Sequence, residues 1–196
     1  MSAKAVYQFF RAYSEGNALH IVDPNSDKTL ITWSFKRQST PHGLCLSDYV
    51  NPRDYRAGDY VCLFVTSAQG PVREKSEEAK ARGEFLKSHA IQSLALETAE
   101  AAAEYLHSFL RSQWGFPDHP DMSMMDRFQA KYRGKRYSFG YPACPELEFQ
   151  KELFEVMRPA EIGVSLTDGF MMSPESSVSA VVFSHPAATY FGVKGD

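Results

Sequence analysis

The sequence predicts one domain of the α+β class, in which strands and helices occupy separate stretches of the chain. Three observations lead to this prediction: an early region of β-branched and aromatic runs, a long helical pattern after it, and a return of strand-like alternation near the end. The length of 196 residues suits one domain with a sizeable core. The aromatic fraction of 13% is high and favours a core rich in strands.

The early region is predicted to form four strands, each a run of β-branched or aromatic residues. They are Val6–Phe10, Leu19–Val22, Thr29–Phe35 and Tyr60–Thr66. Turn-forming segments such as 23–27 and 51–54 separate them. The connections between the early strands are short, and a parallel crossover needs a dozen or more residues. We therefore expect antiparallel pairing.

Residues 72–114 show a helical pattern. At 100° per residue, one apolar stripe is expected to face the core. Its members are Ala90, Leu94, Ala101, Ala102, Tyr105 and Phe109, and Leu106, His107 and Phe109 are expected to be buried near the helix end. Glu97, Glu100 and Glu104 lie beside or opposite this stripe. Such an acidic face is usually solvated; alternatively, one carboxylate points into a neighbouring groove and pairs with a cationic ligand.

The last part of the chain mixes loops, short helices and strands. A polar loop at 116–121 precedes a short helical segment, Ser123–Tyr132. Pro145 suits the first position of a helix that continues through Leu153 and Met157 and ends before Pro159. Alternation then predicts two strands, Val178–Phe183 and Thr189–Val193, joined by a turn at 184–186.

Composition excludes several classes of protein. A net charge of −3 argues against generic nucleic-acid binding, which usually shows a basic patch. No apolar run approaches the roughly 20 residues of a membrane span, and the first residues lack the apolar region of a secretory signal. The cysteines Cys45, Cys62 and Cys144 are an odd number without Cys-x-x-Cys spacing, as in reduced cytosolic proteins. We expect a cytoplasmic protein with no nucleic-acid or membrane partner.

Familiar catalytic signatures are absent from the sequence. It has no Gly-x-Ser-x-Gly elbow, no P-loop and no Rossmann glycine fingerprint after a strand. His119, beside two aspartates, is either a metal ligand or part of a solvated turn. Cys144 is either a nucleophile or a small buried packing residue, and His185 is either a base or a turn residue. No nucleophile, base and orienting acid come together, so the sequence favours a binding domain.

The richest segment is 131–145, a basic and aromatic stretch that ends in Gly140-Tyr141-Pro142-Ala143-Cys144-Pro145. Glycine leaves the backbone open to a ligand, and each proline fixes φ near about −65°. Arg136 offers a planar fork that suits a carboxylate. One interpretation is a ligand-binding loop. The other is a structured loop that caps the next helix.

The pattern Arg136-x-x-x-Gly140-Tyr141-Pro142-Ala143-Cys144-Pro145 closely resembles the signature of the C-terminal activation domain of cobalamin-dependent methionine synthase. Further segments agree with that family in the same order along the chain. They are Ser14–Asn17, Gly43–Val50, Ala99–His107, Ser176–Ser179, Phe183–Pro186 and Tyr190–Phe191. The resemblance extends from about Val6 to Val193, nearly the whole chain.

The resemblance implies a twisted antiparallel sheet with flanking helices and a shallow surface groove for S-adenosylmethionine. In that family the domain docks on the cobalamin-binding module after the cofactor has become inactive cob(II)alamin. An electron from flavodoxin or a flavoprotein reductase, together with the methyl group of S-adenosylmethionine, then restores methylcobalamin. The full enzyme transfers methyl from methyltetrahydrofolate to homocysteine, which this chain alone is not expected to complete.

The resemblance also assigns roles to residues. Arg136 would hold the methionine carboxylate, while Asp48 and Glu100 would be acidic contacts to the amino end or nearby polar groups. Tyr190 would lie beside the ligand. Phe191 stands where the family can have a second tyrosine, so a backbone or stacking contact is expected there. The backbone of Gly140, Pro142 and Ala143 and the ring of Tyr141 would shape the groove and could face the corrin.

Relative to the family, we expect residues 1–196 to be one activation domain that is shortened at both ends. Family members generally have a helical section before the first strand and often a helix after the last. The competing hypothesis is a degenerate docking module that keeps the fold but no longer binds S-adenosylmethionine. The joint presence of Arg136, Asp48 and Glu100 favours the binding domain.

Overall fold

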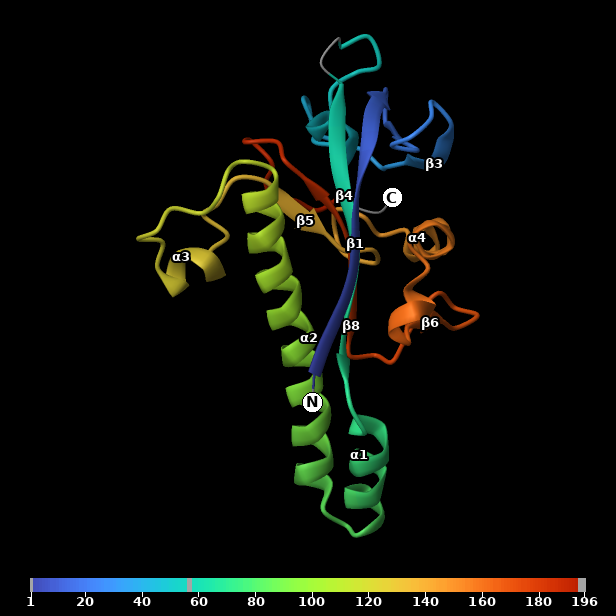
Figure 1. The fold of residues 1–196 in the computed structure, drawn as a ribbon, viewed down its shortest axis with the longest axis vertical. Helices are drawn as coiled ribbons and strands as arrows, with labels where there is room; N and C mark the ends of the chain where they lie inside the picture. Colours follow the sequence, from blue (N-terminus) through green and yellow to red (C-terminus); the bar gives the residue numbers. More distant parts are fainter. Residues whose placement is uncertain (1, 56–57, 194–196) are drawn as a thin grey trace.

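The computed structural model describes residues 2–55 and 58–193, and its centre is one large antiparallel sheet (Figure 1). The six strands lie in the order β3-β2-β1-β4-β8-β5, and each neighbouring pair is antiparallel. The predicted α+β class with an antiparallel sheet is therefore confirmed. The strands are β1 (Ser2–Glu15), β2 (Ala18–Val22), β3 (Thr29–Ser34), β4 (Asp59–Gln69), β5 (Lys135–Tyr137) and β8 (Ser177–Phe183).

All four predicted early strands are present, and three of them, β1, β2 and β4, are longer than predicted. β1 and β4 pair continuously from Ser2 opposite Gln69 to Ala12 opposite Asp59. A tight turn joins β1 to β2, in which Gly16 has a φ of +59°, a conformation that glycine adopts without strain. β2 pairs with β1 only from Arg11 onward, so the first half of β1 has a partner on one side only among the described residues.

β4 is buried along nearly its whole length because both faces of the sheet are covered. Leu63 and Val65 belong to one core cluster, which includes Leu153 of helix α4 (Gln150–Met157). Phe64 points the other way, into a second cluster that contains Ala103 of helix α2 (Phe85–Gln113). Figure 1 shows α2 on one side of the sheet and α4 on the other.

The predicted helical stretch 72–114 forms two helices. Helix α1 (Val72–Ala81) is separated from α2 by a turn in which Gly83 has a φ of +75°. That conformation is incompatible with a continuous α-helix. The two helices lie against each other at the lower end of Figure 1.

The predicted core-facing stripe of α2 is wrong. Ala90, Leu94, Ala101, Tyr105 and Phe109 lie on the exposed side of the helix, and Ala102 is only half-buried. The buried side instead consists of Ser88, Ala95, Ala99, Ala103, Leu106, His107, Leu110 and Arg111. The small alanines let α2 lie close to β4 and β8. Burial of Leu106 and His107 is confirmed, whereas Phe109 is partly exposed and packs edge-on against Tyr7.

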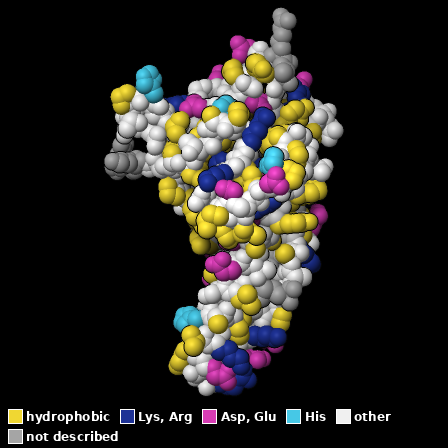
Figure 2. Space-filling view, turned by 90° about the vertical axis from the view of Figure 1, so that its left-hand side faces the viewer, with side chains coloured by type: hydrophobic (Ala, Val, Ile, Leu, Met, Phe, Trp, Pro, Cys, Tyr) yellow, Lys and Arg dark blue, Asp and Glu magenta, His cyan; other side chains and the backbone are white. Residues whose placement is uncertain are grey.

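The surface reflects this arrangement. Figure 2 views the left-hand side of Figure 1 and shows hydrophobic side chains gathered across the middle of the molecule. The exposed large apolar residues of α2 include Leu94 and Tyr105. None of the helices in the described parts of the chain has both the length and the apolar character needed to span a membrane.

The C-terminal helices are close to those predicted but start differently. Ser123 caps α3 (Met124–Phe128), which is shorter than the predicted segment. A 3₁₀ turn, η2 (Leu147–Phe149), precedes α4, so Pro145 lies before the first helical residue and the predicted start is wrong. Helix α4 ends at Met157, before a further 3₁₀ turn, η3 (Pro159–Ile162), as expected from Pro159.

The strand predicted at Val178–Phe183 is β8, but the strand predicted at Thr189–Val193 is wrong. That segment pairs with no strand among the residues 2–55 and 58–193. Its polar backbone atoms bond instead to loops, as in the hydrogen bond of 2.8 Å from the Val193 N–H to the Pro142 carbonyl. Although its sequence alternates like that of a strand, the segment forms a loop that packs against two other loops. The short strands β5, β6 (Ser165–Leu166) and β7 (Met172–Ser173) were not predicted.

Candidate ligand-binding site

Arg136 lies on β5, the edge strand of the sheet, and its side chain extends to the polar flank of α2. Its Nη1 donates a hydrogen bond of 2.5 Å to Oε2 of Glu104, and its Nη2 lies 3.9 Å from Oε2 of Glu100. The side chain of Arg136 is 17% exposed and that of Glu100 is 53% exposed. Two predicted residues from distant segments, Arg136 and Glu100, thus meet. Glu104, the closer partner, was predicted only as part of an acidic face.

A layer of buried polar groups lies behind Arg136. The hydroxyl of Tyr132 donates to Glu104 at 3.1 Å, and the guanidinium of Arg111 lies 3.6 Å from the centre of the Tyr132 ring. Arg111 in turn makes a bidentate pair with Asp118, at 2.6 and 2.7 Å. Asp118 is therefore buried and paired. The interpretation of 116–121 as a solvated turn is correct for the exposed His119 but wrong for Asp118.

Burial and charge set the protonation of this layer. Burial opposes the charge of Arg136, but the hydrogen bond to Glu104 and the negative charge of Glu104, with smaller contributions from Tyr190 and Tyr132, together outweigh it, and the pKa of Arg136 is raised. Burial, with the positive charges of Arg111, Arg136 and Lys135, holds the pKa of His107 well below its usual value. His107 is therefore neutral at physiological pH and adds no charge behind the site.

Residues 184–193, which we call the C-terminal segment, close the site from another side. The carbonyl of Thr189 accepts hydrogen bonds from the hydroxyls of Tyr137, at 2.6 Å, and Tyr49, at 3.4 Å. Tyr190 packs edge-on against Tyr137 and remains half exposed. Burial raises the pKa of Tyr190, the positive charge of Arg136 lowers it, and the negative charge of Glu104 raises it.

Phe191 takes a more structural position than Tyr190. Its ring contacts those of Tyr49 and Tyr137, each with a centroid separation of 6.3 Å. The side chain is partly buried and packs against the larger core cluster. The ring of Phe191 therefore packs against the protein's own tyrosines, and the predicted contact with the ligand stays a prediction.

The Gly140–Pro145 turn is a rigid, hydrogen-bonded loop. Gly140 has a φ of +82°, its N–H donates to the Cys144 carbonyl at 2.8 Å, and the Cys144 N–H donates to the Tyr141 carbonyl at 2.9 Å. Tyr141 projects outward, whereas Ala143 and Cys144 are buried. Burial raises the pKa of the Cys144 thiol, so it is a packing residue and not a nucleophile.

Asp48 lies on a 3₁₀ turn, η1 (Leu46–Tyr49), and already has a partner. Arg37 binds both of its carboxylate oxygens, at 2.6 and 2.7 Å, and the Cys45 N–H donates to Oδ2 at 3.0 Å. The hydrogen bond from Arg37 lowers the pKa of Asp48. The neighbouring Tyr49 stacks on Tyr137, the residue after Arg136, so the Asp48 turn and β5 are joined through two tyrosine rings. Nothing in the sequence singled out Arg37.

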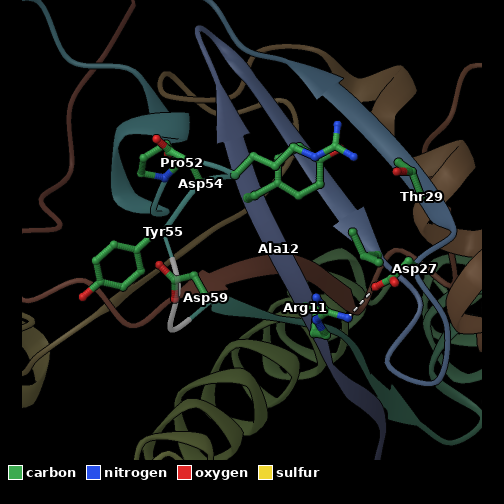
Figure 3. Close-up of a pocket in the computed structure, with 12 residues that line it drawn as sticks. Arg11, Ala12, Asp27, Thr29, Pro52, Asp54, Tyr55 and Asp59 are labelled. Atoms are coloured by element: carbon green, nitrogen blue, oxygen red, sulfur yellow. Dashed lines mark hydrogen bonds and ion pairs between the residues drawn. The ribbon is translucent and has the colours of Figure 1, made fainter.

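Of two hollows on the surface, only one is lined by residues that were predicted to form the site. One of about 180 Å³ is lined by the predicted residues Glu100 and Tyr141, together with Phe139, Met171 and Gln150. A larger one, of about 440 Å³, lies by β1 and β2 and contains no predicted site residue (Figure 3). Arg11, which lines it, is paired with Asp27 at 2.8 Å. Two predicted site residues thus line the smaller hollow, whereas Arg136, Asp48 and Tyr190 are not among its lining residues.

The other candidate residues do not form a reactive centre. His185 accepts a hydrogen bond from the Ala187 N–H at 3.1 Å, which is the turn role. Among the residues that the structure describes, no group of His, Cys, Asp and Glu side chains could hold a metal ion. What the chain does offer is a partly buried arginine at a sheet edge, with acidic and aromatic side chains around it.

The fold and the site thus define an α+β domain that presents a cationic fork at the edge of its sheet, as a module that binds a small ligand does. The family description "Vitamin B12 dependent methionine synthase, activation domain" matches residues 1–195. The chain belongs to this family.

Individual relatives agree with this assignment. The methionine synthases of Mycobacterium leprae (strain TN) and Mycobacterium tuberculosis (strain ATCC 25618 / H37Rv) are each 32% identical to the chain over 97% of its length. The chain spans only 17% of the length of these relatives. A solved structure of the MetH reactivation domain bound to AdoHcy superimposes with a TM-score of 0.88 and 28% identity, covering 97% of this chain and 61% of that one.

Proposed function

We propose that the chain binds S-adenosylmethionine and presents its methyl group for the reductive remethylation of cob(II)alamin held by the cobalamin-binding module of methionine synthase. The observation that carries this proposal is Arg136, oriented at the sheet edge beside Glu100 in a member of the activation-domain family. AdoHcy, named for the similar solved structure, is what S-adenosylmethionine becomes when its methyl group leaves.

The pairing of Arg136 with Glu100 suits the amino-acid end of the ligand. An α-amino acid has a carboxylate and an ammonium group on the same carbon, so it needs a cationic and an anionic partner a few ångströms apart. Nη2 of Arg136 and Oε2 of Glu100 are 3.9 Å apart. We assign the carboxylate to Arg136, through a charge-assisted pair, and the ammonium group to Glu100.

Asp48 keeps a role in this proposal despite its bond to Arg37. A carboxylate has about four lone-pair positions, and Asp48 accepts three hydrogen bonds, two from Arg37 and one from the Cys45 N–H. One position therefore remains for a polar group of the ligand. Fixing by Arg37 also holds the carboxylate in one orientation.

Tyr190, Phe191 and the Gly140–Pro145 turn would form the walls of the site. Tyr190 is half exposed near Arg136, and an aromatic face attracts a cation such as a sulfonium by about 0.5–2 kcal/mol. The exposed ring of Tyr141 lines the hollow that also contains Glu100, and the rigid backbone of Gly140, Pro142 and Ala143 would hold that ring in place.

The reaction needs little chemistry from the chain itself. Cobalamin on the partner module supplies the nucleophile once flavodoxin or a flavoprotein reductase has delivered an electron. The methyl group leaves a sulfonium, so no protein base is required. The chain's contribution is to bind the methyl donor, orient it and carry it to the partner. The packing role of Cys144 and the turn role of His185 are consistent with that division of labour.

Calorimetric titration of the chain with S-adenosylmethionine tests the proposal. We expect saturable one-to-one binding, with AdoHcy competing for the same site. Absence of binding at millimolar ligand would contradict it and favour the docking-module hypothesis. Titration of the chain against a separately produced cobalamin-binding module, with and without S-adenosylmethionine, then separates a ligand-carrying domain from a docking module.

A further inference from the structure

Glu104 is the carboxylate closest to Arg136, and it lies deeper than Glu100. Its Oε2 accepts hydrogen bonds from Nη1 of Arg136, at 2.5 Å, and from the hydroxyl of Tyr132, at 3.1 Å. Its Oε1 is buried and lies 3.8 Å from Nη2 of Arg111. Three groups from α2, β5 and the loop before β5 therefore converge on this single side chain.

We propose that Glu104 is a positioning residue: it holds the inner side of the Arg136 guanidinium so that Nε and Nη2 face the carboxylate of the bound ligand. The proposal rests on the proposed function, because it assumes that Arg136 receives a carboxylate. Glu104 itself would not touch the ligand.

The geometry of the guanidinium supports this division. Arginine has five N–H donors in a fixed plane. Glu104 engages Nη1 alone, and Nε and Nη2 of Arg136 make no hydrogen bond to any residue within 2–55 and 58–193. Nε and Nη2 lie along one edge of the fork, which matches the two oxygens of a carboxylate. One end of Arg136 is thus fixed and one edge is available.

The charges around Glu104 argue that it stays in place when a ligand carboxylate arrives. The cationic side chains of the cluster are Arg111, Arg127, Lys135 and Arg136. The anionic ones are Glu104 and Asp118, with the exposed Glu100 as a third at the rim. Four cations against three anions leave one positive charge, which favours an additional carboxylate. Displacement of Glu104 would instead leave the Tyr132 hydroxyl without its acceptor and would remove the carboxylate that lies 3.8 Å from Nη2 of Arg111.

The surroundings of Glu104 also make it rigid. Tyr132, which donates to it, is held under the guanidinium of Arg111, and Arg111 is fixed by Asp118. A carboxylate held in this way limits the rotamers of Arg136 before the ligand arrives. The entropy of ordering that long side chain is then not lost on binding.

The test compares two ligands on four forms of the chain. S-adenosylmethionine has the carboxylate that Arg136 would hold, and 5′-methylthioadenosine lacks the whole amino-acid end. Both would be titrated into wild type, Glu104→Gln, Arg136→Ala and the double variant, with weak binding followed by ligand-observed NMR. Glu97→Gln is the matched control, because Glu97 is exposed on the same helix and makes no ion pair within the described residues.

We expect Glu104→Gln to weaken S-adenosylmethionine binding about tenfold, within the usual range for coupled neighbours. The affinity for 5′-methylthioadenosine should stay within about twofold of the wild-type value. In the Arg136→Ala background the same change should have no further effect. Glu97→Gln should match wild type. Equal weakening of both ligands would show a merely structural role, and tighter binding of S-adenosylmethionine would show that Glu104 competes with the ligand; either result overturns the proposal.

A second variant protects the test against misfolding. Tyr132→Phe keeps the ring under Arg111 and removes only the hydroxyl that fixes Glu104. It should weaken the binding of S-adenosylmethionine about threefold and leave the binding of 5′-methylthioadenosine nearly unchanged. Equal weakening of both ligands would again contradict the proposal. If wild type itself binds no S-adenosylmethionine, the proposed function has failed, and this outcome is distinct from every variant effect described above.

Discussion

The Arg136 region and the Asp48 region each pair an arginine with a carboxylate, but the two arginines are used differently. Arg37 binds both oxygens of Asp48 and also donates to Asn17 and to the Gly43 carbonyl, so its fork is fully engaged. Arg136 donates a hydrogen bond to Glu104 through Nη1 alone, and its other two guanidinium nitrogens make no hydrogen bond within the described residues. An arginine whose three guanidinium nitrogens all donate to the protein holds loops together. An arginine with nitrogens that make no hydrogen bond can bind a ligand.

Burial separates the two pairs further. The side chains of Arg37 and Asp48 are 35% and 39% exposed, and those of Arg136 and Glu104 are 17% and 29% exposed. Exposed pairs contribute little because water screens them and their side chains are mobile. Buried pairs become costly when one partner is removed. The same chemical pair should therefore have different effects in the two places.

The largest expected effect is on stability, behind Arg136. Asp118→Asn leaves the buried Arg111 with a weaker partner and should lower the free energy of unfolding by about 3 kcal/mol. Asp48→Asn, at the exposed pair, should cost less than about 1 kcal/mol. Urea denaturation of both variants measures the difference, and equal losses would remove the distinction between the two regions.

The next effect is on affinity. Arg136→Ala should weaken S-adenosylmethionine binding by about 1.5–3 kcal/mol, the scale of a lost charge-assisted hydrogen bond. Arg37→Ala is the matched control and should cost no more than about 1 kcal/mol, because Arg37 acts only through Asp48. Calorimetry measures both variants. A larger loss at Arg37 would mean that the ligand carboxylate lies in the Asp48 region.

Two neighbouring aromatic residues make a finer comparison. Tyr190→Ala should reduce affinity by about 0.5–2 kcal/mol and change the melting temperature little, since its ring is half exposed near Arg136. Phe191→Ala should instead lower the melting temperature, because its ring packs against Tyr49 and Tyr137. Differential scanning fluorimetry with and without S-adenosylmethionine separates the two effects. A loss of melting temperature in Tyr190→Ala, with a loss of affinity alone in Phe191→Ala, would contradict this prediction.

The smallest effect is a pH dependence at Asp48. The hydrogen bond from Arg37 lowers its folded-state pKa below the unfolded value of about 3.9. The pair therefore stabilises the fold above about pH 4, and the contribution is lost as the pH falls through the lowered folded-state pKa. Because the pair is more than one third exposed, the loss should stay below about 1 kcal/mol. Acid titration of wild type against Asp48→Asn would show a steeper loss in wild type, and parallel curves would contradict this prediction.

Sequence patterns located what depends on neighbouring residues. The β-branched and aromatic runs identified β1 to β4 and β8 because these residue types favour strands, whether one face of the strand is buried or both. The Gly140–Pro145 turn was recognisable because glycine and proline fix the local backbone. Arg136 was recognised from its place in the same short motif.

What sequence reasoning missed depends on contacts between distant segments. Glu104 and Arg37 were not distinguished from other charged residues, because their partners lie 32 and 11 residues away. Helix α2 has two stripes of apolar residues, and periodicity cannot tell which one faces the sheet; close packing selected the alanine side. Residues 189–193 alternate like a strand, but β5 and the neighbouring loops leave them no strand to pair with.

The C-terminal segment has a consequence for how the protein is made. It joins parts of the chain that are far apart: Gln38 Nε2 donates to the Gly192 carbonyl across 154 residues, and the Tyr49 hydroxyl donates to the Thr189 carbonyl across 140. A chain leaving the ribosome can build β1 to β4 and α2 early, yet the wall proposed around Tyr190 forms only once residues 184–193 have emerged. If the chain binds S-adenosylmethionine as proposed, a version cut before residue 184 would keep most of the sheet and lose that wall.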